Sequence, residues 1–182
     1  MYSGSDIAQV PKEPGVYSLV RSVKNQNSTE WVYTGMSGNL RDRVGQHLTQ
    51  QSGTYSGNKN AASINLERLT HVRWWDCSHI PWPSDIEQME PGNEKVWKQA
   101  IAGAAEIIIK KRHPPMLDDQ AKPKGLSPEV AKSTEFQHQI EKIIEGYSEL
   151  ELPSLENLHR KIDDMGSRLS AIESMLEKSD SN

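Results

Sequence analysis

The sequence has few of the features that mark secreted or membrane proteins. A single cysteine, Cys77, among 182 residues excludes an internal disulfide and a multi-cysteine zinc site. No stretch approaches the roughly 18 uninterrupted apolar residues of a membrane span. The N-terminus also lacks the basic and then apolar segments of a secretory signal. We therefore expect a cytoplasmic protein with no membrane partner.

Aromatic residues and positive charge are scarce as well. With 35% hydrophobic and 6% aromatic residues, the chain has material for one modest core rather than two full-sized domains. The net charge is −4, but residues 11–115 carry 13 Lys/Arg against 10 Asp/Glu, whereas residues 116–182 carry 8 against 14. The first part is thus mildly basic, which permits contact with a polyanion without being evidence for it.

The first half of the chain predicts a hairpin followed by a helix. Residues 16–21 and 31–35 are rich in Val, Tyr, Leu and Trp, which is typical of strands, and a polar segment joins them. After the turn residues Ser37, Gly38 and Asn39, apolar residues recur at intervals of four, which predicts one buried helical face. These residues are Leu40, Val44 and Leu48.

A third strand and a long helix are expected next. Residues 71–76 alternate in a way that indicates a strand, and residues 94–112 form an uninterrupted helical segment that Pro114 and Pro115 terminate. The sequence therefore predicts a small α/β domain over residues 11–118, with a three-stranded, mainly antiparallel sheet flanked by helices.

The C-terminal third is expected to be a helical extension. Residues 119–134 are polar and contain Pro and Gly, which favours a linker, and the apolar spacing in 135–152 predicts a helix. After Pro153, residues 154–178 repeat apolar side chains at steps of three and four, as a coiled coil does. The repeating residues are Leu155, Leu158, Ile162, Met165, Leu169, Ile172 and Leu176.

This repeat predicts association with another helix. Arg168 at a g position and Glu173 at the following e position favour parallel pairing, whereas Gly166 at an e position weakens it. We expect a homodimer or other self-association, or docking to another coiled-coil protein. The rival interpretation is an amphipathic helix that folds back on its own domain.

Glu106 is the only charged residue in the apolar run of residues 100–109. A carboxylate among apolar neighbours loses hydration unless a cation or hydrogen-bond donors compensate. The small residues Ala102 and Gly103 lie one turn earlier on the same helical face, which leaves room for an ion and a phosphate. Alternatively, Glu106 faces solvent at the edge of a buried helix.

Four sequence features together resemble the GIY-YIG nuclease superfamily, which includes restriction-type and stand-alone members. The name triplets match Gly15-Val16-Tyr17 and Tyr33-Thr34-Gly35, the helical arginine matches Arg43, and the metal-binding glutamate matches Glu106. The order and approximate spacing agree across residues 14–118, and an ordered set of this kind is more specific than any single triplet.

The sequence departs from the family pattern at three positions. Thr34 replaces the usual aliphatic residue, Met36 stands where some members have a lysine, and Asp118 occupies the place of an asparagine beyond Pro115. A thioether at position 36 can neither bind phosphate nor take a proton. If a lysine is needed there, activity is reduced.

The resemblance implies hydrolysis of a DNA phosphodiester bond with one Mg²⁺ or Mn²⁺ ion per site. It implies that Glu106 holds the ion, that Arg43 contacts the scissile phosphate, and that Tyr17 orients or deprotonates the attacking water with help from Tyr33. Without Arg43 and Glu106, the two tyrosines are equally typical of aromatic pairs that pack across a hairpin.

Five further residues are candidates for supporting or DNA-binding roles. His47 lies four residues after Arg43 on the same helical face, and a basic cluster ends the long helix. That cluster interacts with its own helix C-terminus, with a nucleic-acid backbone, or with both. The five residues are Arg41, His47, Lys110, Lys111 and Arg112.

We therefore expect a metal-dependent DNA endonuclease, in which a dimer would bring two active sites to the two strands of a duplex. The alternative, motivated by Met36 and Asp118, is a catalytically weakened nucleic-acid-binding or assembly module. A third possibility is a coiled-coil adaptor without nucleic-acid contact.

Overall fold

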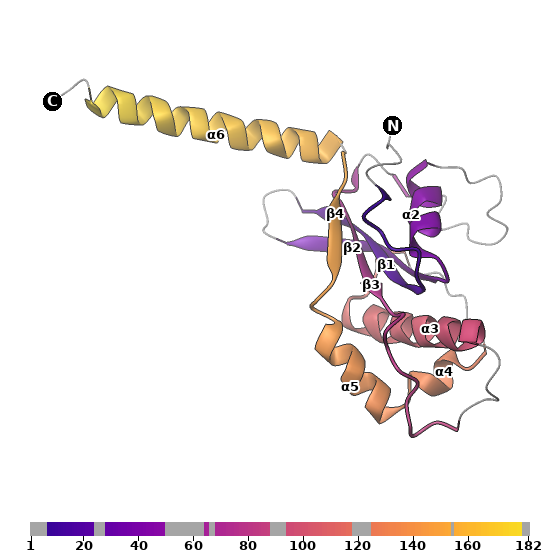
Figure 1. Cartoon of the computed structure of the whole chain (residues 1–182). Helices are drawn as coiled ribbons and strands as arrows, with labels where there is room; N and C mark the ends of the chain where they lie inside the picture. Colours follow the sequence, from indigo (N-terminus) through magenta and orange to yellow (C-terminus); the bar gives the residue numbers. More distant parts are fainter. Residues whose placement is uncertain are drawn as a thin grey trace.

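The computed structural model describes residues 7–23, 28–49, 64–65, 68–87, 94–117, 125–153 and 155–179. Within these segments, four strands form one antiparallel sheet in the order β2-β1-β3-β4, with helices on both faces (Figure 1). The predicted α/β class is confirmed, but the sheet has one strand more than predicted. No helix in this part of the chain has the length and apolar character needed to cross a bilayer.

The predicted hairpin is formed by β1 (Gly15–Ser22) and β2 (Thr29–Ser37). Their register places Tyr17 opposite Gly35 and Leu19 opposite Tyr33. Because side chains alternate along a strand, Tyr17, Leu19 and Tyr33 share one face of the sheet. The third predicted strand, β3 (His71–Asp76), pairs with the other edge of β1.

Helix α2 (Leu40–Thr49) covers the face that carries the two tyrosines. The predicted apolar residues Leu40, Val44 and Leu48 are all buried there, so the spacing identified the correct helical face. Asn39 and Asp42 exchange hydrogen bonds at the start of this helix, the Asp42 amide donating to Asn39 Oδ1 and Asn39 Nδ2 donating to Asp42 Oδ2. This cap fixes the position at which α2 leaves the hairpin.

Helix α3 (Glu94–Arg112) covers the opposite face, over the residues predicted. Its small residues Ala102, Ala104 and Ala105 are fully buried in a core cluster with Val16 and other residues of the sheet, which lets the helix approach closely. On this face the hydroxyls of Ser18 and Thr34 share a buried hydrogen bond of 2.8 Å. Thr34 is therefore accommodated by a polar partner across the hairpin.

The predicted linker over 119–134 is wrong in its second part. Residues Ser127–Val130 form α4, which packs on α3, and Val130 is fully buried in the core cluster of that side. Helix α5 (Thr134–Ile143) follows, with Ser133 Oγ accepting a hydrogen bond from the Phe136 amide as its N-cap. The segment is mostly polar, so its few buried residues could not be recognised from composition.

The predicted helix over 135–152 is also too long. It ends at Ile143, and β4 (Ser148–Glu151) then pairs antiparallel with β3 at the sheet edge. Leu150 and Leu152 are buried and alternate with exposed Glu149 and Glu151, which is the period of a strand. The core therefore continues beyond residue 118, where the predicted α/β domain ended.

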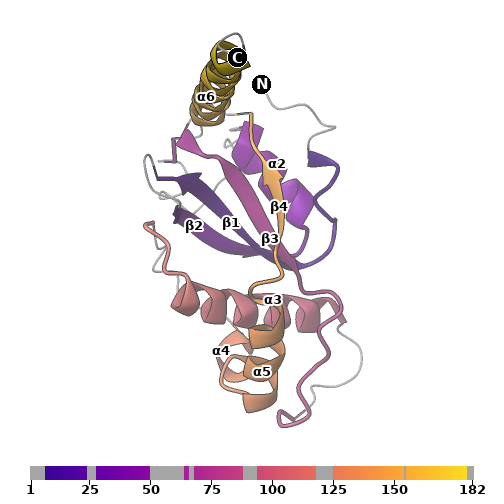
Figure 2. The same cartoon turned by 90° about the vertical axis from the view of Figure 1, so that its left-hand side faces the viewer.

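An arginine between two aromatic rings fixes β4 to the sheet. The guanidinium of Arg73 lies 5.1 Å from the centre of the Trp31 ring and 4.3 Å from that of Tyr147. Its Nε donates to Glu149 at 3.0 Å, so the charge of this 9% exposed residue is compensated. Figure 2 shows β4 at the edge of the sheet beside β3.

The last helix, α6 (Leu155–Ser179), leaves the rest of the molecule (Figures 1 and 2). Asn157 Nδ2 attaches its first turn by donating to the carbonyls of Thr70 and Leu152 at 2.6 and 2.8 Å. The helix predicted over 154–178 is thus present, whereas its pairing into a coiled coil stays a prediction.

Candidate active site

Three ring side chains from β1, β2 and α2 gather on the α2 face of the sheet. The ring centres of Tyr17 and Tyr33 are 6.0 Å apart, and that of His47 lies 5.3 Å from Tyr17 and 5.6 Å from Tyr33. The Tyr17 hydroxyl and His47 Nε2 form a buried hydrogen bond of 2.7 Å. Residues separated by 30 positions in the chain thus form one cluster.

Gly35 lies beneath both phenol oxygens. A Cβ at this position would be 2.9 Å from the Tyr33 hydroxyl oxygen and 3.0 Å from that of Tyr17. Carbon atoms do not approach so closely without displacing their neighbours, so only glycine fits here. The last residue of the second triplet is therefore required by the position of the two hydroxyls.

The cluster is buried. Tyr17 is 1% exposed, Tyr33 5% and His47 7%. Burial, with a smaller contribution from the positive charge of Arg43, lowers the pKa of His47 from 6.5 to about 4. At neutral pH the imidazole is therefore uncharged, and one of its nitrogens accepts a hydrogen bond.

Arg43 belongs to the same group because it lies one turn before His47 on α2. Its backbone amide donates to the Asn39 carbonyl in the first turn of the helix. Its charge is close enough to disfavour a second cation on His47. The structure thus brings together three of the four predicted catalytic residues, Tyr17, Tyr33 and Arg43, and adds His47 to them.

Glu106 comes from α3, which covers the opposite face of the sheet. Its Oε1 lies 2.8 Å from Nζ of Lys110 one turn later, and both side chains are mostly buried, with 19% and 17% exposed. The carboxylate therefore does not face bulk water. Lys110, predicted as one of the DNA-binding residues, compensates the charge of a carboxylate on its own helix, and its contact with DNA stays a prediction.

Met36 packs against the core cluster on the α3 side of the sheet. Its Cε lies 3.7 Å from the position of a Cβ on Gly103, about one helical turn before Glu106. Met36 directly follows Gly35, where a Cβ would crowd both hydroxyls. Helix α3 thus passes beside the end of β2 that carries the second triplet.

The remaining predicted residues differ in their surroundings. Arg41 donates from Nε to the carbonyl of Val10 at 2.7 Å and from a terminal nitrogen to that of Ala8 at 2.8 Å, so it holds the N-terminal segment on α2. Lys111 and Arg112 are exposed at the end of α3, where a nucleic acid can reach them. Asp118 lies outside the described residues.

His47 is more central to the site than the supporting role predicted for it. Its spacing of four residues from Arg43 is visible in the sequence, but the contact with Tyr17 depends on how α2 packs on the hairpin.

Comparison with protein-family models, curated proteins and solved structures finds no match to this chain. The resemblance to GIY-YIG nucleases therefore depends on the sequence motifs alone.

Proposed function

We propose that this protein is a metal-dependent DNA endonuclease that hydrolyses phosphodiester bonds. The observation that carries the proposal is the buried hydrogen bond between the Tyr17 hydroxyl and the uncharged His47 imidazole, beside Tyr33 and Arg43. The pKa of the buried His47 is strongly lowered, and a perturbed pKa of this kind is typical of catalytic groups.

The pair provides a route for a proton. A free phenol has a pKa near ~10 and is a poor base at neutral pH. Here the Tyr17 hydroxyl donates its proton to Nε2 of His47 while its oxygen accepts a proton from the attacking water, so the water gains nucleophilicity without a free phenolate. A phosphate near Arg43 adds negative charge, which raises the pKa of His47 and helps it take the proton.

Arg43 supplies positive charge for the phosphate. A guanidinium presents several N–H donors in a planar fork that matches two non-bridging phosphate oxygens. Its placement one turn from His47 allows it to offset the charge that develops on the phosphate while the proton leaves the water.

Glu106 would hold the metal ion. A single carboxylate fits Mg²⁺ or Mn²⁺, which keep several water ligands and need few protein ligands. The lysine at 2.8 Å shows that this carboxylate already compensates one cation, so an ion would share it with Lys110 or take its place. When bound, such an ion supplies Lewis-acid stabilisation of phosphate charge.

A second candidate is a nucleic-acid-binding module without catalysis. Two observations favour it: Tyr17 and Tyr33 are almost fully buried, as ordinary core aromatics are, and Glu106 is ion-paired with Lys110. In this case Lys111 and Arg112 would bind the DNA backbone, with strong dependence on salt.

The test is cleavage of plasmid and branched DNA by the full chain with Mg²⁺ or Mn²⁺. We expect nicked or linear products, loss of cleavage with a chelator, and at least a roughly 100-fold slower reaction for Glu106→Gln. The matched control is Glu94→Gln, because Glu94 lies on the same helix and also pairs with a lysine one turn later, Lys98 at 2.9 Å.

The outcomes separate the two candidates. Cleavage that Glu94→Gln retains and Glu106→Gln loses supports the nuclease. Salt-dependent DNA binding without cleavage under any metal condition supports the binding module. The absence of both cleavage and binding contradicts both functions.

A further inference from the structure

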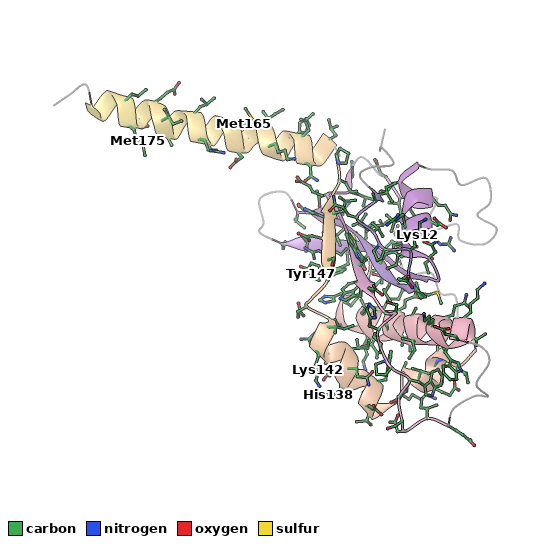
Figure 3. All side chains as sticks on the ribbon, viewed as in Figure 1. Lys12, His138, Lys142, Tyr147, Met165 and Met175 are labelled. Atoms are coloured by element: carbon green, nitrogen blue, oxygen red, sulfur yellow. The ribbon has the colours of Figure 1, made fainter. Side chains whose placement is uncertain are left out.

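Helix α6 exposes an apolar face from Leu155 to Leu176. Its seven a and d side chains are each more than half exposed, between 53% and 61%. Figure 3 shows Met165 and Met175 on the part of α6 that lies beyond the rest of the molecule. The exposed a and d residues are Leu155, Leu158, Ile162, Met165, Leu169, Ile172 and Leu176.

A helix in this situation needs a partner to be stable. Isolated helices in water are marginal because packing of their apolar face supplies most of their stability. Monomeric proteins also rarely expose apolar patches of more than a few hundred Å². With about 100 Å² exposed on each leucine-sized side chain, the seven residues offer roughly 700 Å², close to the ~800 Å² that one partner buries in a stable interface.

The attachment of α6 leaves this face accessible. Asn157, which binds the carbonyls of Thr70 and Leu152, occupies a c position, well to the side of the a and d face. Lys161 pairs with Glu151 at 3.3 Å and also lies beside the apolar face rather than within it. The contacts with the body therefore orient α6 without covering its apolar residues.

The charges beside the apolar face identify the partner. In a parallel pair of identical helices, a g residue faces the e residue of the next heptad on the other helix, which places Arg168 beside Glu173 of the second copy, twice by symmetry. An antiparallel pair with full overlap instead places Lys161 beside Arg168 of the second copy, and like charges repel.

We infer that α6 joins two copies of this chain as a parallel two-stranded coiled coil. The interface is the a and d face of α6, with Arg168 and Glu173 as the flanking pair. The two α/β bodies then lie at the same end of the coil, because both helices begin there. This inference does not depend on the proposed nuclease activity.

The first test is the mass of the full chain in solution by light scattering and sedimentation. We expect twice the mass of one 20.5 kDa chain at micromolar concentration. The double variant Ile162→Asp with Leu169→Asp buries four charges in the dimer and should raise the dissociation constant at least about 100-fold. Its matched control adds the same charges at f positions, Ser167→Asp with Ser174→Asp, and should remain a dimer.

The second test is the orientation of the two helices. With Cys77 replaced by Ser, Leu176→Cys brings two thiols together in a parallel coil, and mild oxidation should give a covalent dimer. In an antiparallel coil these thiols lie at opposite ends of the interface and no cross-link forms.

Three results would overturn the inference. They are a monomeric mass at all concentrations, a mass of three or more chains, and a dimer that the two aspartates do not dissociate. A dimer in which the Leu176→Cys variant gives no cross-link overturns the parallel arrangement. Each result can be read whether or not the protein cleaves DNA.

Discussion

The two faces of the sheet bury polar side chains in different ways. On the α3 face, two polar contacts join buried groups to a partner: Ser18 with Thr34, and Arg73 with Glu149. On the α2 face, the Tyr17 hydroxyl is hydrogen-bonded to the His47 imidazole, and burial lowers the pKa of that imidazole to about 4. These two contacts compensate for burial on the α3 face, whereas the Tyr17–His47 pair contains an imidazole that can exchange a proton.

The largest expected difference between the faces concerns catalysis. Tyr17→Phe removes the hydroxyl that is hydrogen-bonded to His47 and should slow DNA cleavage by about 10²- to 10⁴-fold, the usual contribution of acid–base groups. Tyr147→Phe removes a hydroxyl from the α3 face and keeps the ring over Arg73, so its cleavage rate should equal that of the wild type. Equal cleavage rates for both variants in single-turnover assays would show that the Tyr17 hydroxyl contributes no more to catalysis than the Tyr147 hydroxyl.

The second difference is a dependence of stability on pH. Because the folded protein holds the pKa of His47 at about 4 and the unfolded chain has 6.5, the unfolded state binds a proton first as the pH falls. The free energy of unfolding should therefore fall by about 3 kcal/mol between pH 6.5 and pH 4, in addition to the contributions of the carboxylates and of His113, whose pKa is also lowered by burial.

Urea denaturation at several pH values measures this dependence. His47→Gln retains an acceptor for the Tyr17 hydroxyl but does not titrate. Subtracting its pH profile from that of the wild type isolates the contribution of His47, and two parallel profiles would show that the imidazole is protonated equally in both states.

A smaller effect is expected on the α3 face. Thr34→Val leaves the fully buried Ser18 hydroxyl without its partner and should cost about 1 to 3 kcal/mol of stability. Combining it with Ser18→Ala removes both partners, so the double variant should lose less than the sum of the single losses. Additive losses in thermal denaturation would mean that the two hydroxyls do not interact.

The smallest expected effect is a gain in stability from a substitution in α2. Gly45 lies within α2, and a Cβ there would meet only Ile7 Cδ1 at an ordinary distance of 3.7 Å. Gly45→Ala should stabilise the protein by about 0.5 to 1 kcal/mol, because alanine loses less conformational entropy in a helix. Thermal denaturation would show this gain as a higher melting temperature. A lower melting temperature would indicate that the space beside Gly45 cannot hold a methyl group.

Sequence patterns predicted the hairpin, β3, α2 and α3, because each has a long or regular apolar repeat. They missed β4, where only Leu150 and Leu152 mark the strand and follow directly after a helical repeat. Four residues are too few to show a period of two against that background. Pairing with β3 and the contacts of Arg73 complete the strand, and these are properties of the folded chain.

The site was predictable only in part, for a similar reason. The triplets and Arg43 could be read from the chain, but the importance of His47 follows from its contact with Tyr17 across 30 positions. The pair of Glu106 with Lys110 had a visible spacing of four, yet the basic cluster around Lys110 suggested a DNA contact instead. The candidate residues of the site were thus easier to predict from the sequence than the contacts that each of them makes.

The late position of β4 also affects the order of events during synthesis. Until the ribosome has made residues 148–151, the outer edge of β3 has no neighbouring strand and can pair with other chains. Helix α6 emerges directly after β4. Each nascent chain can therefore add β4 to its own sheet before α6 is complete, which shortens the time during which the edge of β3 is open.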